Sequence, residues 1–354
     1  MNIAIFLPNW IGDAVMATPA VRALRDHYRD ARITLVVRPN VAGVFSGCNW
    51  FDDVVFMRGK SWQDGTASAA LKLRGRDIDL AVLFPNSFRA ALTAWLGGCK
   101  RRIGYARYGR SALLTDALAP MRDAAGKLAV SPVIDAYNLL AVRAGCLDPG
   151  VKMRLSTTPE DEADADAVWR GAGLLRYREV ICLNPGAAFG AAKHWPTDYF
   201  AALARDLADK RGAGVLVLCG PAERPLSQEI AAKARHPAVH ALGDQATPVR
   251  MDGPPLSLGL TKACVRRSDL LVTTDSGPRH FAAAFDRPVV TLFGPTWIDW
   301  TETYHPQAIH LQKKVDCGPC QLRVCPLDHK CMKHLLPAEA FAAAEGLLRL
   351  GKSA

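Results

Sequence analysis

The sequence contains no apolar run that approaches the roughly 18 residues needed to cross a bilayer, so it predicts no transmembrane helix. The first 13 residues, MNIAIFLPNWIGD, carry no basic residue before their apolar part. They therefore predict a first β-strand rather than a signal peptide. With 28 Gly and 23 Pro among 354 residues, and 22% charged residues, the chain is neither collagen-like, low-complexity nor disordered. We expect a soluble, cytoplasmic protein of two domains, because one core usually stops growing near ~250–300 residues.

The positive charge is concentrated in the first half of the chain. The net charge is +10. Residues 1–158 carry 21 Lys and Arg against 12 Asp and Glu, whereas residues 159–354 carry 23 against 22. The first half is therefore the better candidate to face an anionic molecule, although composition alone favours an ordinary solubilising surface. The basic stretch 100–110, with Arg107, Arg110 and two interleaved tyrosines, suits phosphates on nucleic acid, a membrane surface or a small substrate.

Short β-branched runs alternate with helix-length segments, a pattern that predicts α/β domains with parallel sheets. We expect strands at 2–7, 32–37, 51–57 and 80–87, and in a second series at 179–186, 213–220, 268–277 and 287–295. A helix is expected at about 14–27 and an acidic helix at 159–170, near the domain boundary. The predicted division is a first domain of residues 1–165, a second of 176–336 and a C-terminal helix of 337–354.

The strands end in loops rich in Gly, Pro, Asn, Asp or Ser, and such loops meet at one edge of a parallel sheet. In T-D-S-G-P-R-H (274–280), Ser276 and Gly277 stand at the start of an Ala-rich helix. The amino end of a helix favours a phosphate, but Ser276 could equally do no more than cap the helix. The spacing leaves both interpretations open.

Three further side chains in these loops are candidates for chemistry. Lys193 could reach a diphosphate, or be an exposed surface lysine. Glu223 could accept hydrogen bonds from ribose hydroxyls. Asp13, at the start of the first helix, could deprotonate a hydroxyl, or only stabilise the amino end of that helix.

Four cysteines lie within 15 residues, at Cys317, Cys320, Cys325 and Cys331. The spacing C-x2-C-x4-C-x5-C could wrap one tetrahedral metal ion, with zinc, iron and an iron–sulfur cluster not separable. Disulfides are the alternative, which the absence of a signal peptide disfavours. We expect a structural metal in this Cys-rich segment (317–331). The other six cysteines are scattered and predicted to be small core residues.

Three phrases in combination resemble the ADP-heptose:lipopolysaccharide heptosyltransferases of glycosyltransferase family 9. They are N-W-I-G-D (9–13), L-F-P-N-S-F-R-A-A-L (83–92) and N-P-G-A-A-F-G-A-A-K-H-W-P (184–196). T-D-S-G-P-R-H-F-A-A-A and R-P-V-V-T-L-F-G-P-T complete the resemblance, which covers roughly residues 1–310 and is closer to the heptosyltransferase II branch than to the heptosyltransferase I branch. The Cys-rich segment lies outside it, although some related heptosyltransferases carry clustered cysteines, including iron-binding members that modify proteins.

The resemblance implies a GT-B fold, with two Rossmann-like domains facing across a cleft. It implies that the second domain binds ADP-heptose, through Gly186, Lys193, Glu223, Asp275, Ser276, Gly277 and His280. It also implies that Asp13 is the general base of an inverting transfer that needs no cofactor. The lipopolysaccharide acceptor would bind the first domain, through Asn86, Ser87, Arg89, Arg101 and Arg102.

The expected acceptor is heptosyl-Kdo2-lipid A, an anionic lipid that the enzyme would meet at the cytoplasmic face of the inner membrane. Several alternatives remain at this point. Kdo2-lipid A or a protein could be the acceptor, or the chain could be a nucleotide-sugar epimerase of similar fold. A nucleic-acid-binding protein and an inactive nucleotide sensor are further alternatives. No nucleic-acid-binding motif is evident, so we expect no nucleic-acid partner.

Overall fold

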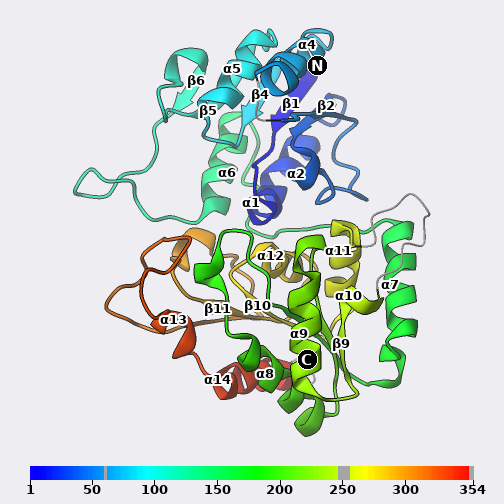
Figure 1. The fold of residues 1–354 in the computed structure, drawn as a ribbon. Coiled ribbons are helices and arrows are strands. Elements are labelled where there is room, and N and C mark those ends of the chain that lie inside the picture. Colours follow the sequence, from blue (N-terminus) through cyan, green and yellow to red (C-terminus); the bar gives the residue numbers. More distant parts are fainter. Residues whose placement is uncertain (60–61, 246–255, 351–354) are drawn as a thin grey trace. The chain divides into compact units, whose positions relative to one another are not determined.

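The computed structural model describes residues 1–59, 62–245 and 256–350, and the chain divides into two compact units (Figure 1). Unit 1 comprises Met1–Ser156 with Asp299–Tyr304, and unit 2 comprises Thr157–Ile298 with His305–Ala354. Each unit is built on one six-stranded sheet whose paired strands are all parallel. The predicted α/β class with two Rossmann-like domains is confirmed.

The sheet of unit 1 has the strand order β3-β2-β1-β4-β5-β6. The strands are β1 (Asn2–Phe6), β2 (Arg32–Val37), β3 (Asp53–Phe56), β4 (Leu80–Leu83), β5 (Arg101–Tyr105) and β6 (Asp116–Leu118). Ile3 of β1 lies beside Ile33 of β2 on one side and Leu80 of β4 on the other. The chain therefore changes direction between β1 and β4, where ligands of such sheets usually bind.

Unit 2 repeats this order as β12-β11-β10-β7-β8-β9, with the change of direction between β7 and β10. Its strands are β7 (Val180–Asn184), β8 (Gly214–Val217), β9 (Val239–Ala241), β10 (Leu270–Thr274), β11 (Val289–Phe293) and β12 (Ala308–Gln312). The central strands are buried along their whole length, which is why they appear in the sequence as continuous apolar runs.

The helices of unit 1 are α1 (Ile11–Met16), α2 (Thr18–His27), α3 (Pro39–Ala42), α4 (Ser68–Arg74), α5 (Phe88–Leu96) and α6 (Val133–Arg143). The single helix expected at 14–27 is thus two helices. Pro19 explains the break, because its ring clashes with the carbonyl of Val15 and offers that carbonyl no N–H. The Thr18 hydroxyl donates to the Val15 carbonyl instead, at 2.7 Å.

The helices of unit 2 are α7 (Pro159–Gly171), α8 (Thr197–Arg211), α9 (Arg224–Ala234), α10 (Leu242–Gln245), α11 (Leu258–Arg267), α12 (Gly277–Ala284), α13 (Lys330–Lys333) and α14 (Pro337–Leu350). The expected C-terminal helix is α14, and residues 351–354 of that prediction lie outside the described residues. α14 buries Ala340, Ala344, Leu347 and Leu348 in the core around the second sheet.

The acidic helix α7 belongs to unit 2, whereas the predicted boundary at residue 165 fell inside it. Its Glu162 accepts from both Arg266 and Arg267 of α11 at 2.8 Å, and Asp166 pairs with Arg267 at 2.5 Å. These ion pairs explain why α7 packs with the second unit. No pattern in the sequence indicated that 299–304 joins unit 1.

Four short strands were not predicted, namely β5, β6, β9 and β12. β5 begins with Arg101 and Arg102, and these residues were therefore expected to belong to a basic surface rather than to a strand. β12 is only half-buried along its length, and β6 and β9 have three residues each, too few to show a pattern of burial. Among the helices of the described residues, none combines the length and the apolar character that a membrane span requires.

We predict that Glu162→Gln makes the protein about 1–2 kcal/mol less stable at pH 7, measured by urea unfolding. Burial would raise the pKa of Glu162, but hydrogen bonds from Arg266, Thr157 and Arg267 lower it from 4.5 to about 2. Because the folded pKa is the lower one, this stabilisation is present above pH 4.5 and is lost as the pH falls toward 2.

The difference between wild type and E162Q should therefore shrink at pH 3. The exposed Glu160 on the same helix provides the control E160Q, which should change stability by less than about 0.5 kcal/mol. A difference between wild type and E162Q that is as large at pH 3 as at pH 7 would contradict the prediction.

Candidate functional site

The loops that leave β1 and β4 enclose a cavity of about 460 Å³ at the switch point of unit 1. Asp13 and Asn86 line it, together with Ser87. Most of the remaining wall is aromatic, supplied by Trp10, Phe84, Phe88, Tyr108 and Tyr137. A volume in the range of ~300–1,000 Å³ with apolar walls and few polar groups is typical of a small-molecule site. The structure thus brings Asp13, Asn86 and Ser87 together, as expected.

Asp13 is the third residue of α1 and is half-buried. The N-cap of this helix is Trp10, so Asp13 is not its capping residue. Burial and the charge of Asp13 raise the pKa of Tyr137 well above its usual value, with Tyr105 as a smaller cause. Asp13 and Tyr137 line the same cavity, and the Tyr137 hydroxyl keeps its proton at neutral pH.

Arg110, whose guanidinium is fully buried, supports the loop 85–87 through hydrogen bonds. Its Nε donates to the Tyr105 carbonyl at 2.9 Å, and Nη1 donates to the Pro85 carbonyl. Nη2 donates to Asn86 Oδ1 at 3.2 Å, which leaves the Asn86 amide N–H groups for other partners. Burial, with a smaller effect of Arg107, lowers the pKa of Arg110 to about 10, so it remains a cation.

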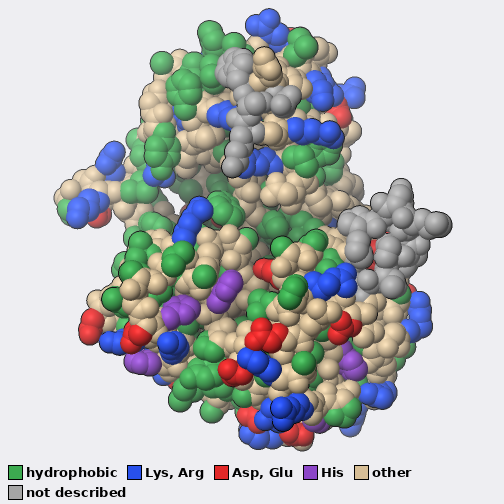
Figure 2. Space-filling model, in the orientation of Figure 1, with side chains coloured by type: hydrophobic (Ala, Val, Ile, Leu, Met, Phe, Trp, Pro, Cys, Tyr) green, Lys and Arg blue, Asp and Glu red, His purple; other side chains and the backbone are tan. Residues whose placement is uncertain are grey.

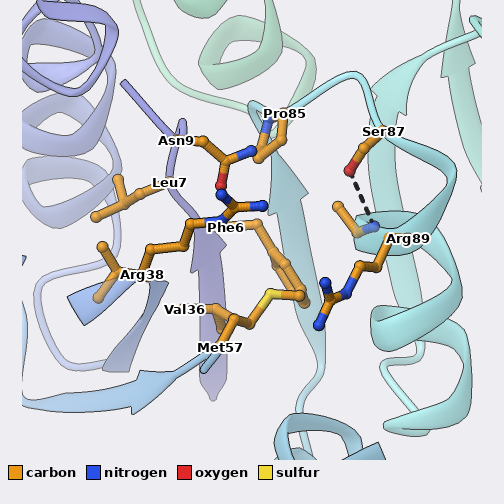
Figure 3. A pocket seen from close by; sticks show the side chains of 11 residues that line it. Phe6, Leu7, Asn9, Val36, Arg38, Met57, Pro85, Ser87 and Arg89 are labelled. Atoms are coloured by element: carbon orange, nitrogen blue, oxygen red, sulfur yellow. Dashed lines mark hydrogen bonds between the residues drawn. The ribbon is translucent and has the colours of Figure 1, made fainter. Parts of the chain in front are cut away.

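A second cavity of about 30 Å³ adjoins the first, because Asn9, Pro85 and Ser87 line both. It has room for about one water-sized group. Arg38 and Arg89 reach it from β2 and α5, and Figure 3 shows Arg38 extended toward Asn9. Arg89 donates to Thr66 Oγ1 at 2.9 Å, whereas the side chain of Arg38 is exposed and forms no hydrogen bond or ion pair with the described residues.

The structure does not bring Arg101 and Arg102 to this site. Both lie at the start of β5, at the amino end of the parallel strands, whereas the cavities lie at the carboxyl ends of β1 and β4. Arg101 pairs with Asp116 at 2.9 Å, and Arg102 donates to the Leu113 carbonyl at 2.7 Å. On the face drawn in Figure 2, Lys and Arg side chains form several separate groups rather than one patch. On this face the positive charge therefore does not form one continuous surface.

In unit 2, the loops after β7 and β10 are joined by a network of hydroxyl and amide groups at the switch point. Asn184 Nδ2 donates to Thr273 Oγ1 at 3.0 Å and to Ser276 Oγ at 2.9 Å. The Thr274 hydroxyl donates to the Gly186 carbonyl at 2.7 Å. Ser276 occupies the N-cap position of α12 but its side chain makes no capping hydrogen bond. Its hydroxyl instead ties the two loops together.

Asp275 is the centre of a buried ionic cluster. Its carboxylate accepts from Lys193 at 2.5 Å, from Thr296 at 2.7 Å and from Arg279 at 3.2 Å. Burial would raise the pKa of Asp275, but Lys193 and Arg279 outweigh it and hold the pKa below its usual range. Lys193 is 9% exposed, so the surface-lysine alternative is wrong. Two cations, Lys193 and Arg279, thus face the Asp275 carboxylate.

His280 and Glu223 complete the surroundings of this cluster. Burial, with Arg279 next, lowers the pKa of His280 well below its usual value, so the ring is neutral. Its Nδ1 has no hydrogen-bond partner among the described residues. Glu223 accepts from the Gly220 N–H at 3.0 Å, and a Cβ at Gly186 would lie 2.2 Å from its carboxylate. Gly186 therefore gives this carboxylate access to the end of β7.

The model of the family described as glycosyltransferase family 9 (heptosyltransferase) matches residues 67–331. The chain belongs to this family. Lipooligosaccharide heptosyltransferase 2 of Campylobacter jejuni is 27% identical over 359 residues, which cover 99% of each chain. Lipopolysaccharide heptosyltransferase 2 of Escherichia coli K12 is 27% identical over 313 residues, which cover 85% of each chain. The solved structure of E. coli ADP-heptose lipopolysaccharide heptosyltransferase II superposes with a TM-score of 0.77, at 25% identity and 100% coverage of both chains.

The resemblance seen in the sequence is thus confirmed, and the protein is a glycosyltransferase of the heptosyltransferase family. This assignment favours an enzyme over the nucleic-acid-binding alternative. Two residues at these sites of the transferase, Arg38 and Thr296, were not predicted from the sequence. Thr296 directly follows the strand expected at 287–295, so its position in the loop after that strand could have indicated it. Arg38 directly follows a strand predicted correctly, but nothing in the sequence related it to Arg89.

The Cys-rich segment of the transferase has no regular structure between 313 and 329. Burial raises the pKa of Cys331, and the charges of Cys325, Cys317 and Cys320 are smaller causes in the same direction. Within the described ranges, however, no three His, Cys, Asp or Glu side chains are arranged to ligate one metal ion. The four-cysteine metal site stays a prediction from spacing. Of the other six cysteines, all but Cys48 are buried.

We predict that the purified transferase contains about one equivalent of zinc or iron per chain by elemental analysis, and that Cys317→Ser with Cys320→Ser loses it. Both thiols are exposed, so removal of the metal with a chelator should make them react quickly with a thiol reagent. Buried Cys182, whose pKa burial raises to about 12, should react only after unfolding and serves as internal control. The prediction would be contradicted if the protein as purified contained no metal and its Cys317 and Cys320 reacted rapidly without chelator.

Proposed function

We propose that this enzyme transfers L-glycero-D-manno-heptose from ADP-heptose to the inner core of lipopolysaccharide, with heptosyl-Kdo2-lipid A as the acceptor. The relatives above are named heptosyltransferase 2, which supports a second heptose transfer. The observation that carries the proposal is the Asp13 carboxylate in the wall of a sugar-sized, aromatic cavity at the switch point of unit 1. Aromatic faces suit the apolar faces of a sugar ring, and the carboxylate suits its hydroxyls.

The donor is assigned to unit 2, at the Asp275 cluster. An ammonium group has three N–H donors, and Lys193 uses two of them on the Asp275 carboxylate and carbonyl. The third is available to a diphosphate oxygen. The excess positive charge of Lys193 and Arg279 over Asp275 would stabilise the negative charge that develops on the departing ADP. Gly277 would contribute its backbone N–H, and Glu223 is the candidate to accept from the ribose hydroxyls.

The proposed reaction is a single displacement at the anomeric carbon of the heptose. Asp13 accepts the proton of the acceptor hydroxyl as that oxygen forms the new glycosidic bond. The bond from the anomeric carbon to the diphosphate oxygen breaks, ADP leaves, and the configuration inverts. Because the cations of the chain itself stabilise the leaving group, transfer is expected to need no added divalent cation.

We predict that Asp13→Asn lowers kcat for transfer from ADP-heptose to heptosyl-Kdo2-lipid A by about 10²- to 10⁴-fold, the usual contribution of a general base. Asn keeps the size of the side chain and removes its basicity. The Kd for ADP, measured by calorimetry, should stay within about twofold of wild type because the donor is assigned to unit 2.

Near-wild-type kcat in D13N would refute the general-base role. ADP binding without transfer by the wild type would show that the acceptor is wrong, and Kdo2-lipid A and protein acceptors would then be tested. A wild type that does not bind ADP would refute the assignment of the donor.

The acceptor is anionic, and the small cavity beside the aromatic one is where the proposal places one of its negative groups. Arg38 and Arg89 supply two guanidinium groups there, and the guanidinium of Arg38 makes no hydrogen bond or ion pair with the described part of the chain. The cavity is too small for a sugar ring, so the proposal is that it receives one oxygen of a carboxylate or phosphate group projecting from a ring held in the larger cavity.

We predict that Arg38→Ala raises the KM for the acceptor about five- to tenfold and leaves the Kd for ADP unchanged, since one exposed charge-assisted contact is lost. Arg32→Ala is the matched control, because Arg32 is an exposed arginine at the start of β2, whereas Arg38 directly follows the end of that strand. Equal effects of R38A and R32A would show that net charge, rather than this cavity, attracts the acceptor.

A further inference from the structure

The Cys-rich segment covers the loop that carries Lys193. Ala192, directly before Lys193, is 2% exposed, and both of its backbone groups bond to this segment. Its N–H donates to the Arg323 carbonyl at 3.0 Å. Its carbonyl lies 2.7 Å from Nε2 of His329. Because a carbonyl can only accept, the Nε2 of His329 must carry the proton in this contact.

The segment approaches the same loop at two further points. A Cβ at Gly190 would lie 2.3 Å from the Arg323 carbonyl oxygen, so only glycine permits this approach. The ring of Phe189 lies 5.5 Å from the Arg323 guanidinium carbon and 4.8 Å from Lys193 Nζ. The segment therefore contacts the loop through backbone groups and through the ring that also touches the Lys193 ammonium.

A second loop of the ionic cluster is held by the same part of the chain. The backbone N–H of Gln321 donates to the Pro295 carbonyl at 2.8 Å. Gln312, at the end of β12, donates to the Thr296 carbonyl at 2.8 Å. Thr296 in turn donates its hydroxyl to Asp275. Two of the three groups that contact the Asp275 carboxylate, Lys193 and Thr296, are thus supported from residues 312–329.

We propose that the Cys-rich segment sets the position of the Lys193 ammonium, with His329 as the positioning residue, and that the affinity for the donor depends on this contact. The inference rests on the proposed role of Lys193 toward the diphosphate. His329 acts through the Ala192 carbonyl and does not itself contact the donor. A hydrogen bond to a diphosphate oxygen weakens steeply with misplacement, so a small shift of the loop lowers affinity.

The test is the Kd for ADP of His329→Ala, measured by calorimetry. The loss of one neutral hydrogen bond that orders the loop is expected to weaken ADP binding about fivefold, while the KM for the acceptor stays the same. His329→Gln keeps an N–H donor on a chain of similar reach and should restore binding to within about twofold. His334→Ala, an exposed histidine just after α13, is the matched control and should bind ADP as the wild type does.

Hydrogen exchange of the peptide that contains Ala192 reports on the same contact without a ligand. In H329A this peptide should exchange about tenfold faster, and peptides from unit 1 should not change. Wild-type ADP affinity in H329A would overturn the inference, even if exchange became faster, and so would a failure of H329Q to restore binding. A wild type that does not bind ADP would refute the donor site itself, which the first titration shows before any variant is compared.

Discussion

An ionised carboxylate is stable inside a protein only when cations and hydrogen bonds compensate for its lost hydration, and this requirement organises the site in unit 2. Asp275 is 5% exposed. Its partners Lys193, Arg279 and Thr296 come from the loop after β7, from α12 and from the loop after β11. Three separate segments therefore contact one carboxylate. Their contacts order the loops of unit 2, because without them the charge of Asp275 could not be buried.

The two units share one strand order and differ in the chemistry at the switch point. In unit 1 the loops hold a carboxylate, Asp13, in an aromatic wall, and the buried cation Arg110 supports the loop from beneath. In unit 2 the loops hold a cation-rich cluster around a carboxylate. One scaffold thus presents a carboxylate in an aromatic wall in one copy and a cation-rich cluster in the other, because side chains in the loops, rather than the sheets, determine the chemistry of each site.

The charge pattern of the sequence predicted that the first half of the chain faces an anionic molecule, and the structure places the arginines proposed for this role in different surroundings. Arg89 lines a cavity, whereas Arg101 and Arg102 are held by Asp116 and by backbone carbonyls. A run of arginines has the same sequence pattern whether its side chains face a ligand or form ion pairs and hydrogen bonds within the domain. The partners that decide between these are 11 to 15 residues away along the chain, Leu113 in a 3-10 turn and Asp116 in the strand β6 that the sequence did not reveal.

The sequence by itself determined the α/β class, the central buried strands, the family and the loops that carry Asp13, Lys193 and Asp275. These features depend on local patterns, since burial of a parallel strand and the turn after it are encoded in consecutive residues. Only the tertiary structure decided that α7 packs with unit 2, that Arg38 and Arg89 share a cavity, and that the Cys-rich segment supports the loop of Lys193. Each of these depends on contacts between residues far apart in the chain, which no local pattern specifies.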